Sequence, residues 1–95
     1  MALMRQSGLQ PGPEATKWLK TAAEAGDGLS MFNLVMVLFH GLGAQPDYVG
    51  AYQWFTLAAD RGQVDGRKGM IPKMTTEQVA AAERLAAAWN AEHKD

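Results

Sequence analysis

Apolar side chains recur at helical spacing in four separate stretches of the chain. In residues 14–26 and 50–62 they fall three or four positions apart, which indicates helices with one buried face. Residues 28–40 are apolar around most of the helical circumference, which indicates a helix packed on more than one side. Residues 76–93 are rich in alanine and keep a narrower apolar stripe. We therefore expect an all-α domain.

Local signals predict where these helices begin and end. Gly26 can take the left-handed conformation that closes the first helix. Asp27 and Asp47 stand where their carboxylates can accept hydrogen bonds from the free amides of the next two helices. Thr75 and Gln78 have the spacing of a capping box at the start of the last helix.

Two of the predicted helices are near-copies of each other. Trp18 and Trp54 stand 36 positions apart in matching segments, residues 14–26 and 50–62. The identical pairs are Ala15/Ala51, Trp18/Trp54, Ala22/Ala58, Ala23/Ala59 and Gly26/Gly62. A fixed period of this size indicates a stacked-repeat architecture. We expect both tryptophans to occupy equivalent, buried positions beside small alanines.

The repeat weakens toward the C-terminus. Gly66 and Gly69 disfavour a helix in residues 64–71, and Pro72 follows them, so we expect one or two short turns there. The next helix begins after Thr75, earlier than the period places it, which is typical of a cap. The expected organisation is a flexible lead at 1–12 and a single domain at 13–95, comprising a partial repeat at 13–26, a full repeat at 27–62 and a C-terminal cap at 63–95.

The segment 30–62 resembles a Sel1-like repeat, a relative of the tetratricopeptide repeat. It shares the order and spacing of Phe32-Asn33-Leu34, Gly41-Leu42-Gly43, Asp47-Tyr48, Trp54-Phe55 and Ala58-Ala59. The resemblance implies a short right-handed α-solenoid of antiparallel helix pairs, with a C-terminal capping helix and a scaffold or adaptor role. The positions that carry the repeat signature are Ala15, Trp18, Ala22, Ala23, Gly26, Leu34, Gly41, Gly43, Asp47, Ala51, Trp54, Ala58, Ala59, Gly62 and Trp89.

The composition of the chain argues against several classes of function. Nine lysine and arginine residues balance ten acidic residues without forming a basic stripe, so we expect no nucleic-acid partner. There is no cysteine, and the two histidines lack metal-ligand spacing. No nucleophile or phosphate-loop motif occurs. We expect no enzyme activity, including the β-lactam hydrolysis linked to some Sel1-like proteins, and no cofactor or metal.

The chain also lacks the marks of insertion or export. Its longest apolar run, residues 31–39, is shorter than the ~20 residues that a membrane span needs. Residues 1–13 lack the apolar core of a signal peptide. We expect no membrane span and a cytoplasmic protein if the chain is complete as written, or a periplasmic one if a leader was trimmed.

The predicted function is non-catalytic binding of a protein or peptide on the concave helical face. The candidate contact residues are Ser30, Asn33, Met36, Val37 and His40, which share one side of the helix at 28–40. Each of two candidates has an alternative role. His40 could be present because a histidine at the C-terminus of a helix interacts favourably with the helix dipole. Asn33 could form hydrogen bonds with loop groups of its own repeat. Two alternatives for the chain stay open: a self-associating homodimer, and the C-terminal part of a longer repeat array.

Overall fold

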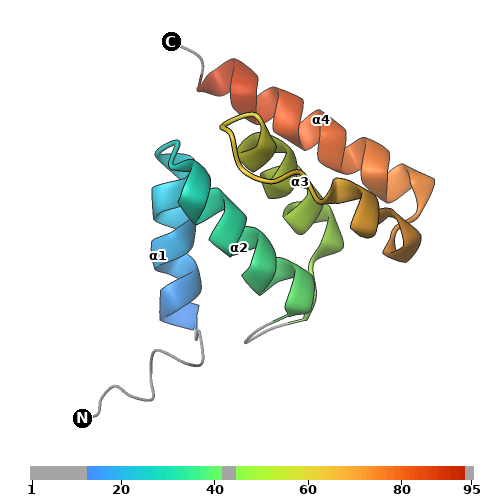
Figure 1. The fold of residues 1–95 in the computed structure, drawn as a ribbon, viewed down its shortest axis with the longest axis horizontal. Helices are drawn as coiled ribbons and strands as arrows, with labels where there is room; N and C mark the ends of the chain where they lie inside the picture. Colours follow the sequence, from blue (N-terminus) through green and yellow to red (C-terminus); the bar gives the residue numbers. More distant parts are fainter. Residues whose placement is uncertain (1–12, 42–44, 94–95) are drawn as a thin grey trace.

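The computed structural model describes residues 13–41 and 45–93, and every regular element in these ranges is helical. The α-helices are α1 (Pro13–Glu24), α2 (Gly28–His40), α3 (Tyr48–Ala59) and α4 (Thr76–Glu92). Each packs against the next in chain order, so the helices form a stack running from α1 to α4 (Figure 1). Two short 3-10 turns, η2 (Arg67–Gly69) and η3 (Ile71–Lys73), connect α3 to α4. The predicted all-α solenoid is confirmed. The expected lead at 1–12 lies outside the described residues.

Most of the predicted helix ends are present. Gly26, Gly41 and Gly62 have positive φ angles of 97°, 66° and 89°, which a side chain would disfavour. The Asp47 carboxylate accepts a hydrogen bond from the Gly50 amide at 2.9 Å, as expected of an N-cap. Gly43, the other glycine of that predicted turn, lies outside the described residues.

The two other capping predictions had different outcomes. At the start of α4, the Gln78 amide donates to Thr75 Oγ1 at 3.0 Å and the Thr75 amide donates to Gln78 Oε1 at 2.9 Å, which completes the capping box. Asp27 occupies the N-cap position of α2, but its side chain accepts no backbone hydrogen bond there. Its carboxylate accepts from the Ser30 hydroxyl instead, so the prediction of a direct carboxylate cap was wrong.

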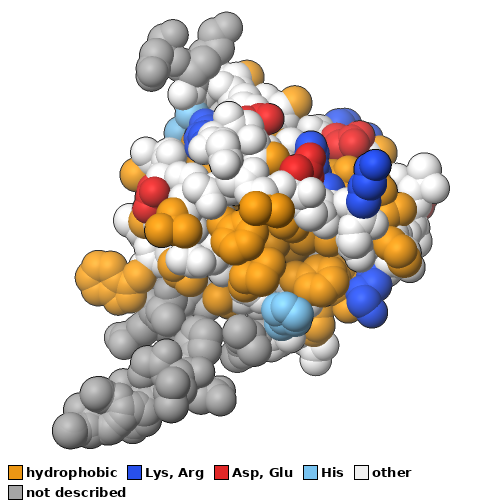
Figure 2. Space-filling view, in the orientation of Figure 1, with side chains coloured by type: hydrophobic (Ala, Val, Ile, Leu, Met, Phe, Trp, Pro, Cys, Tyr) orange, Lys and Arg blue, Asp and Glu red, His pale blue; other side chains and the backbone are white. Residues whose placement is uncertain are grey.

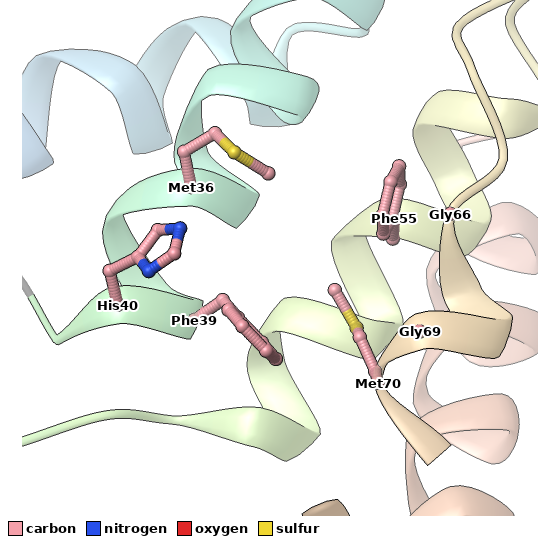
Figure 3. Close-up of a pocket in the computed structure, with 7 residues that line it drawn as sticks. All are labelled: Met36, Phe39, His40, Phe55, Gly66, Gly69 and Met70. Atoms are coloured by element: carbon pink, nitrogen blue, oxygen red, sulfur yellow. The ribbon is translucent and has the colours of Figure 1, made fainter. Parts of the chain in front are cut away.

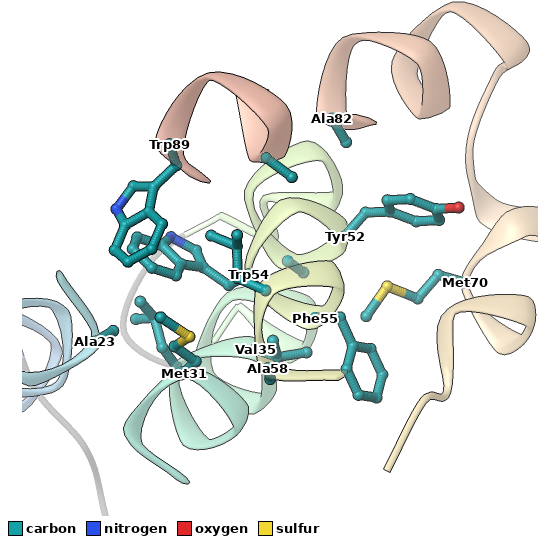
Figure 4. Close-up of a cluster of buried hydrophobic side chains, with 14 residues drawn as sticks. Ala23, Met31, Val35, Tyr52, Trp54, Phe55, Ala58, Met70, Ala82 and Trp89 are labelled. Atoms are coloured by element: carbon teal, nitrogen blue, oxygen red, sulfur yellow. The ribbon is translucent and has the colours of Figure 1, made fainter. Parts of the chain in front are cut away.

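A single apolar core joins the four helices (Figure 4). Helix α2 lies between α1 and α3, as its nearly all-apolar surface predicted. Helix α3 lies between α2 and α4 and buries Tyr52 and Leu57 in addition to its predicted stripe, so the prediction of one buried face was wrong for α3. Tyr52, Leu57 and Met70 belong to this core although the repeat pattern did not predict them. The buried residues that form the core are Ala23, Met31, Leu34, Val35, Ala51, Tyr52, Trp54, Phe55, Leu57, Ala58, Met70, Ala82, Ala86 and Trp89.

The two equivalent tryptophans have different environments. Trp54 is 5% exposed, whereas Trp18 is 76% exposed, so the prediction that both are buried was wrong for Trp18. Helix α1 has its main described contact with α2, and it buries Ala23 against that helix. Trp54 has the additional cover of α4, and no described helix covers Trp18 in the same way. The side chain of Ala15, the other expected member of this stripe, lies outside the described part.

Candidate peptide-binding groove

An open apolar groove of about 210 Å³ lies where α2, α3 and the η2 turn meet (Figure 3). Figure 2 shows apolar side chains gathered at the centre of this face of the molecule, with a histidine at the lower edge. His40 is the one ionisable residue among those that line the groove. The lining residues are Met36, Phe39, His40, Phe55, Gly66, Gly69 and Met70.

Helix α2 supplies one wall of the groove. Met36, Phe39 and His40 stand at positions i, i+3 and i+4, so they project from the same side of the helix. Phe39 contacts the His40 ring and the Tyr48 ring, with ring centroids 5.2 and 5.4 Å apart. Met36 and Phe39 are only half-buried, which leaves part of each apolar surface open to the groove.

Phe55 of α3 and the η2 turn complete the opposite wall. The Phe55 ring packs edge to face on Phe32, with centroids 5.7 Å apart. A Cβ added at Gly66 would lie 2.8 Å from Phe55 Cζ, so only glycine lets the turn approach this ring without displacement. At Gly69 an added Cβ would meet nothing within 4 Å. The turn itself is closed by the Gly69 amide, which donates to the Gly66 carbonyl at 3.0 Å.

Methionine and phenylalanine give the groove two kinds of surface. Met70 is anchored in the core at 3% exposure, and the unbranched thioether side chains of Met36 and Met70 can adapt their shape. The rings of Phe39 and Phe55 are held by aromatic neighbours. The arrangement therefore combines a fixed aromatic frame with adjustable contacts, as a site for a variable apolar side chain requires.

The structure brings only part of the predicted contact surface to this groove. Met36 and His40 line it, whereas Ser30 and Asn33 do not. Val37 is 7% exposed, so the prediction that it offers a free surface was wrong. It stands three positions after Leu34 and shares the buried side of α2 with it.

The sequence analysis did not predict the other five residues that line the groove. Phe55 fits the buried stripe of its helix, and Phe39 extends the apolar surface of α2, so neither one signalled a groove. Gly66 and Gly69 predicted short turns, which are present as η2 and η3, but their spacing did not reveal that Gly66 makes room for an aromatic ring. Met70 is brought to the site by the packing of a turn with no regular apolar period.

The sequence matches the model of the Sel1 repeat over residues 2–27 and 28–63. The chain belongs to the Sel1 repeat family. The groove combines α2 and α3 of the second match with Gly66, Gly69 and Met70, which follow it. The expected boundaries, 13–26 and 27–62, differ from the matched ones mainly in the start of the first repeat. Helix α4 lies outside both matches.

A solved structure with the same architecture supports this assignment. The crystal structure of a protective antigen present in uropathogenic Escherichia coli strains, which displays an SLR fold, superposes with a TM-score of 0.76 and 29% sequence identity. The match covers 83% of this chain and 18% of that one, so this chain spans about a fifth of the antigen's length. No curated protein sequence gives a significant match.

A polar basin of about 490 Å³ lies next to the η2 turn in this Sel1-repeat protein. It is lined by Tyr52, Asp65, Arg67, Lys68, Ile71 and Glu83. Arg67 forms an ion pair with Asp65 at 2.6 Å and donates from Nη1 to Thr56 Oγ1 at 3.1 Å. The bond to Thr56 ties the first residue of η2 to α3, so it helps to fix the wall of the groove.

Two residues that line this basin have shifted pKa values. Hydrogen bonds from the Arg67 side chain and amide hold the pKa of Asp65 at about 2, below its ordinary 3.8. Burial raises the pKa of Tyr52, and so does Glu83, whose carboxylate accepts a hydrogen bond from the Tyr52 hydroxyl at 3.5 Å. Residues 13–41 and 45–93 contain no cluster of three or more histidine or acidic side chains that could hold a metal ion. No helix in the described part of the chain is both long and apolar enough to span a membrane.

Proposed function

We propose that this Sel1-repeat protein binds a peptide segment of a protein partner in the apolar groove between α2, α3 and η2. Sel1 repeats typically mediate protein–protein interaction, which supports a protein partner in general terms. The observation that carries the specific proposal is the groove itself, whose walls leave Met36 and Phe39 partly exposed. Burial of this apolar surface under another apolar side chain lowers the free energy of the complex.

The size of the groove sets what it can accept. An apolar cavity of roughly 150 Å³ is enough to bind benzene, so about 210 Å³ suits one large aliphatic or aromatic side chain. Burial of one such side chain contributes about 1.5–3 kcal/mol. A micromolar complex needs about 8 kcal/mol. The peptide must therefore make further contacts with the surrounding surface, and the groove acts as its anchor point.

A pair of matched variants tests the proposal. Short random peptides displayed on phage are selected on the wild-type protein, and the affinity of a selected peptide is measured by fluorescence anisotropy. Met36→Asp places a carboxylate in the apolar groove and should weaken binding at least tenfold. Leu85→Asp places the same group at a position on α4 that is 46% exposed, and it should bind as the wild type does. Circular dichroism confirms that both variants fold. Equal binding by the two variants would contradict the proposal.

Self-association is a second candidate, favoured by the exposure of Trp18. A tryptophan that is 76% exposed, on a helix whose main described contact is α2, offers a large apolar surface to a second copy. Sedimentation velocity over a range of concentrations should then show a dimer in the wild type and a monomer in Trp18→Ala. A wild-type monomer at every concentration would exclude this candidate and leave the peptide groove unaffected.

A further inference from the structure

The apolar surface of α2 extends beyond the groove toward the start of the helix. Leu29, Phe32, Met36 and Phe39 stand at positions i, i+3, i+7 and i+10, a spacing that places them on one side of α2. Leu29 is 57% exposed, and the other three are only partly buried. At 1.5 Å per residue, this α2 stripe runs along the helix for about 15 Å. The groove includes only its second half, at Met36 and Phe39.

The segment that follows α3 passes beside the first half of the α2 stripe. A Cβ added at Gly28 would lie 3.6 Å from Gln63 Cγ, so this segment comes close to the start of α2. It then reaches Gly66, whose backbone adjoins the Phe55 ring in the groove wall. Val64 lies between these two points and is 72% exposed. The groove therefore continues into a longer apolar surface along α2.

This surface offers an extended peptide few partners for its backbone. Helix α2 contains no lysine, arginine, aspartate or glutamate. Every regular element in residues 13–41 and 45–93 is helical, so these ranges have no strand edge that could pair with an extended peptide. In the η2 wall, the amides of Gly69 and Met70 already donate to the carbonyls of Gly66 and Arg67. An extended peptide would bury backbone groups here without partners, whereas a helix pairs its backbone groups internally.

We propose that the segment bound along α2 is an amphipathic helix of the partner, with its apolar face on the α2 stripe and one large apolar side chain in the groove. This inference rests on the proposed peptide-binding function and names the form of the partner. Apolar residues at i, i+3 or i+4, and i+7 of a helix extend over about 10.5 Å, so three anchors fit along the stripe. The two anchors outside the groove supply the further contacts that a single anchor lacks.

The pattern and conformation of selected peptides test this proposal. Random peptides of about 16 residues, long enough for four helical turns, are displayed on phage and selected on the wild type. Enriched peptides should share apolar residues at i, i+3 or i+4, and i+7. The Cα chemical shifts of a ¹³C-labelled peptide should move to helical values on binding. A central proline that faces away from the anchors should weaken binding at least about tenfold relative to alanine at the same position, because proline interrupts a helix.

A protein variant tests whether the partner contacts the α2 stripe outside the groove. Leu29→Asp changes an exposed position that does not line the groove, and it should weaken the binding of an enriched peptide about three- to tenfold. Leu85→Asp makes the same change on α4, at a position that is 46% exposed, and should leave the affinity unchanged. Circular dichroism confirms that both variants fold.

The possible failures are distinguishable. Enriched peptides that lack the helical pattern, tolerate the central proline, or bind Leu29→Asp as tightly as the wild type would overturn the helical-partner proposal. If such peptides still lose affinity for Met36→Asp, the groove function stands. Selection that enriches no peptide on the wild type would overturn both.

Discussion

The indole of Trp54 meets the indole of Trp89 edge to face, with ring centroids 5.9 Å apart and ring planes at 69°. Trp54 comes from α3 and Trp89 from α4, so this contact joins the matched Sel1 repeat to the helix that follows it. The Arg61 guanidinium lies 5.0 Å from the centre of the Trp89 ring, and the His93 ring stacks on Trp89 at 3.7 Å. An aromatic pair of this kind contributes about 0.5–1.5 kcal/mol beyond the area that it buries.

Replacement of Trp54 by alanine should remove much of the protein's stability. The side chain is 5% exposed, and its loss leaves a cavity against Trp89, with an expected cost of about 3–5 kcal/mol. For a small domain this is a large fraction of the free energy of unfolding. Urea denaturation followed by far-ultraviolet circular dichroism measures the change, and a loss below about 1 kcal/mol would contradict the core role of Trp54.

Trp18→Ala is the matched control for that experiment. Trp18 occupies the equivalent repeat position but is 76% exposed, so its replacement should change the free energy of unfolding by about 0.5 kcal/mol or less. The comparison is made at concentrations where the wild type is monomeric. A cost for Trp18→Ala as large as that for Trp54→Ala would mean that α1 is covered by another part of the protein.

Gly66, which precedes the η2 turn, and Gly69, which ends it, should differ in their tolerance of alanine. Gly66→Ala forces its Cβ against the Phe55 ring, since the undisturbed distance would be 2.8 Å, and it should cost about 1–3 kcal/mol. Gly69→Ala meets nothing within 4 Å and should be neutral or stabilising by about 0.4–1 kcal/mol. Thermal unfolding of the two variants gives the comparison, and equal melting temperatures would show that Phe55 does not pack on the turn.

The capping box at the start of α4 should contribute measurably to stability. Thr75→Ala removes the acceptor for the Gln78 amide and should cost about 1 kcal/mol. Thr75→Ser keeps a hydroxyl at this position and should restore most of the lost stability. Chemical denaturation of the three proteins tests this order, and an alanine variant as stable as the serine variant would argue against a functional cap.

The Asp65–Arg67 pair should stabilise the fold at neutral pH, and this contribution should be lost in acid. Because the pKa of Asp65 is about 2 in the folded protein and 3.8 ordinarily, folding is favoured by this group above pH 3.8. That contribution is lost as the pH falls from about 3.8 through 2, where the paired carboxylate becomes protonated. Carboxyl NMR titration should give a midpoint near 2 in the wild type and a higher one in Arg67→Gln, which loses the side-chain bonds but keeps the bond from the backbone amide of residue 67. An unchanged midpoint in this variant would show that a group other than the Arg67 side chain lowers the pKa of Asp65.

The parts of the fold that depend on local chemistry could be predicted from the sequence. Gly26 ends α1, Asp47 caps α3 and Thr75 begins α4 through interactions within a few residues of each. The exposure of Trp18 could not be predicted from its repeat, because burial depends on which element lies beside α1. The period treats equivalent positions alike, whereas among the described helices α4 packs mainly against α3.

The groove was predictable only on the α2 side. Met36 and His40 could be placed on one side of that helix from their spacing alone. The assignment of Val37 to the same side was wrong, since the packing of α2 against its neighbours decides which edge of a nearly all-apolar helix remains open. Phe55 and Met70 join the site through tertiary contacts between distant segments, for which the repeat period contains no signal.

Methyl NMR of the protein with a bound peptide tests the groove most directly. The methionine methyl groups report on separate places: Met36 and Met70 line the groove, whereas Met31 is fully buried and does not. Addition of a peptide selected on the wild type should shift the Met36 and Met70 methyl resonances strongly and leave that of Met31 nearly unchanged. A peptide that binds without moving the Met36 and Met70 resonances would contradict peptide binding in this groove.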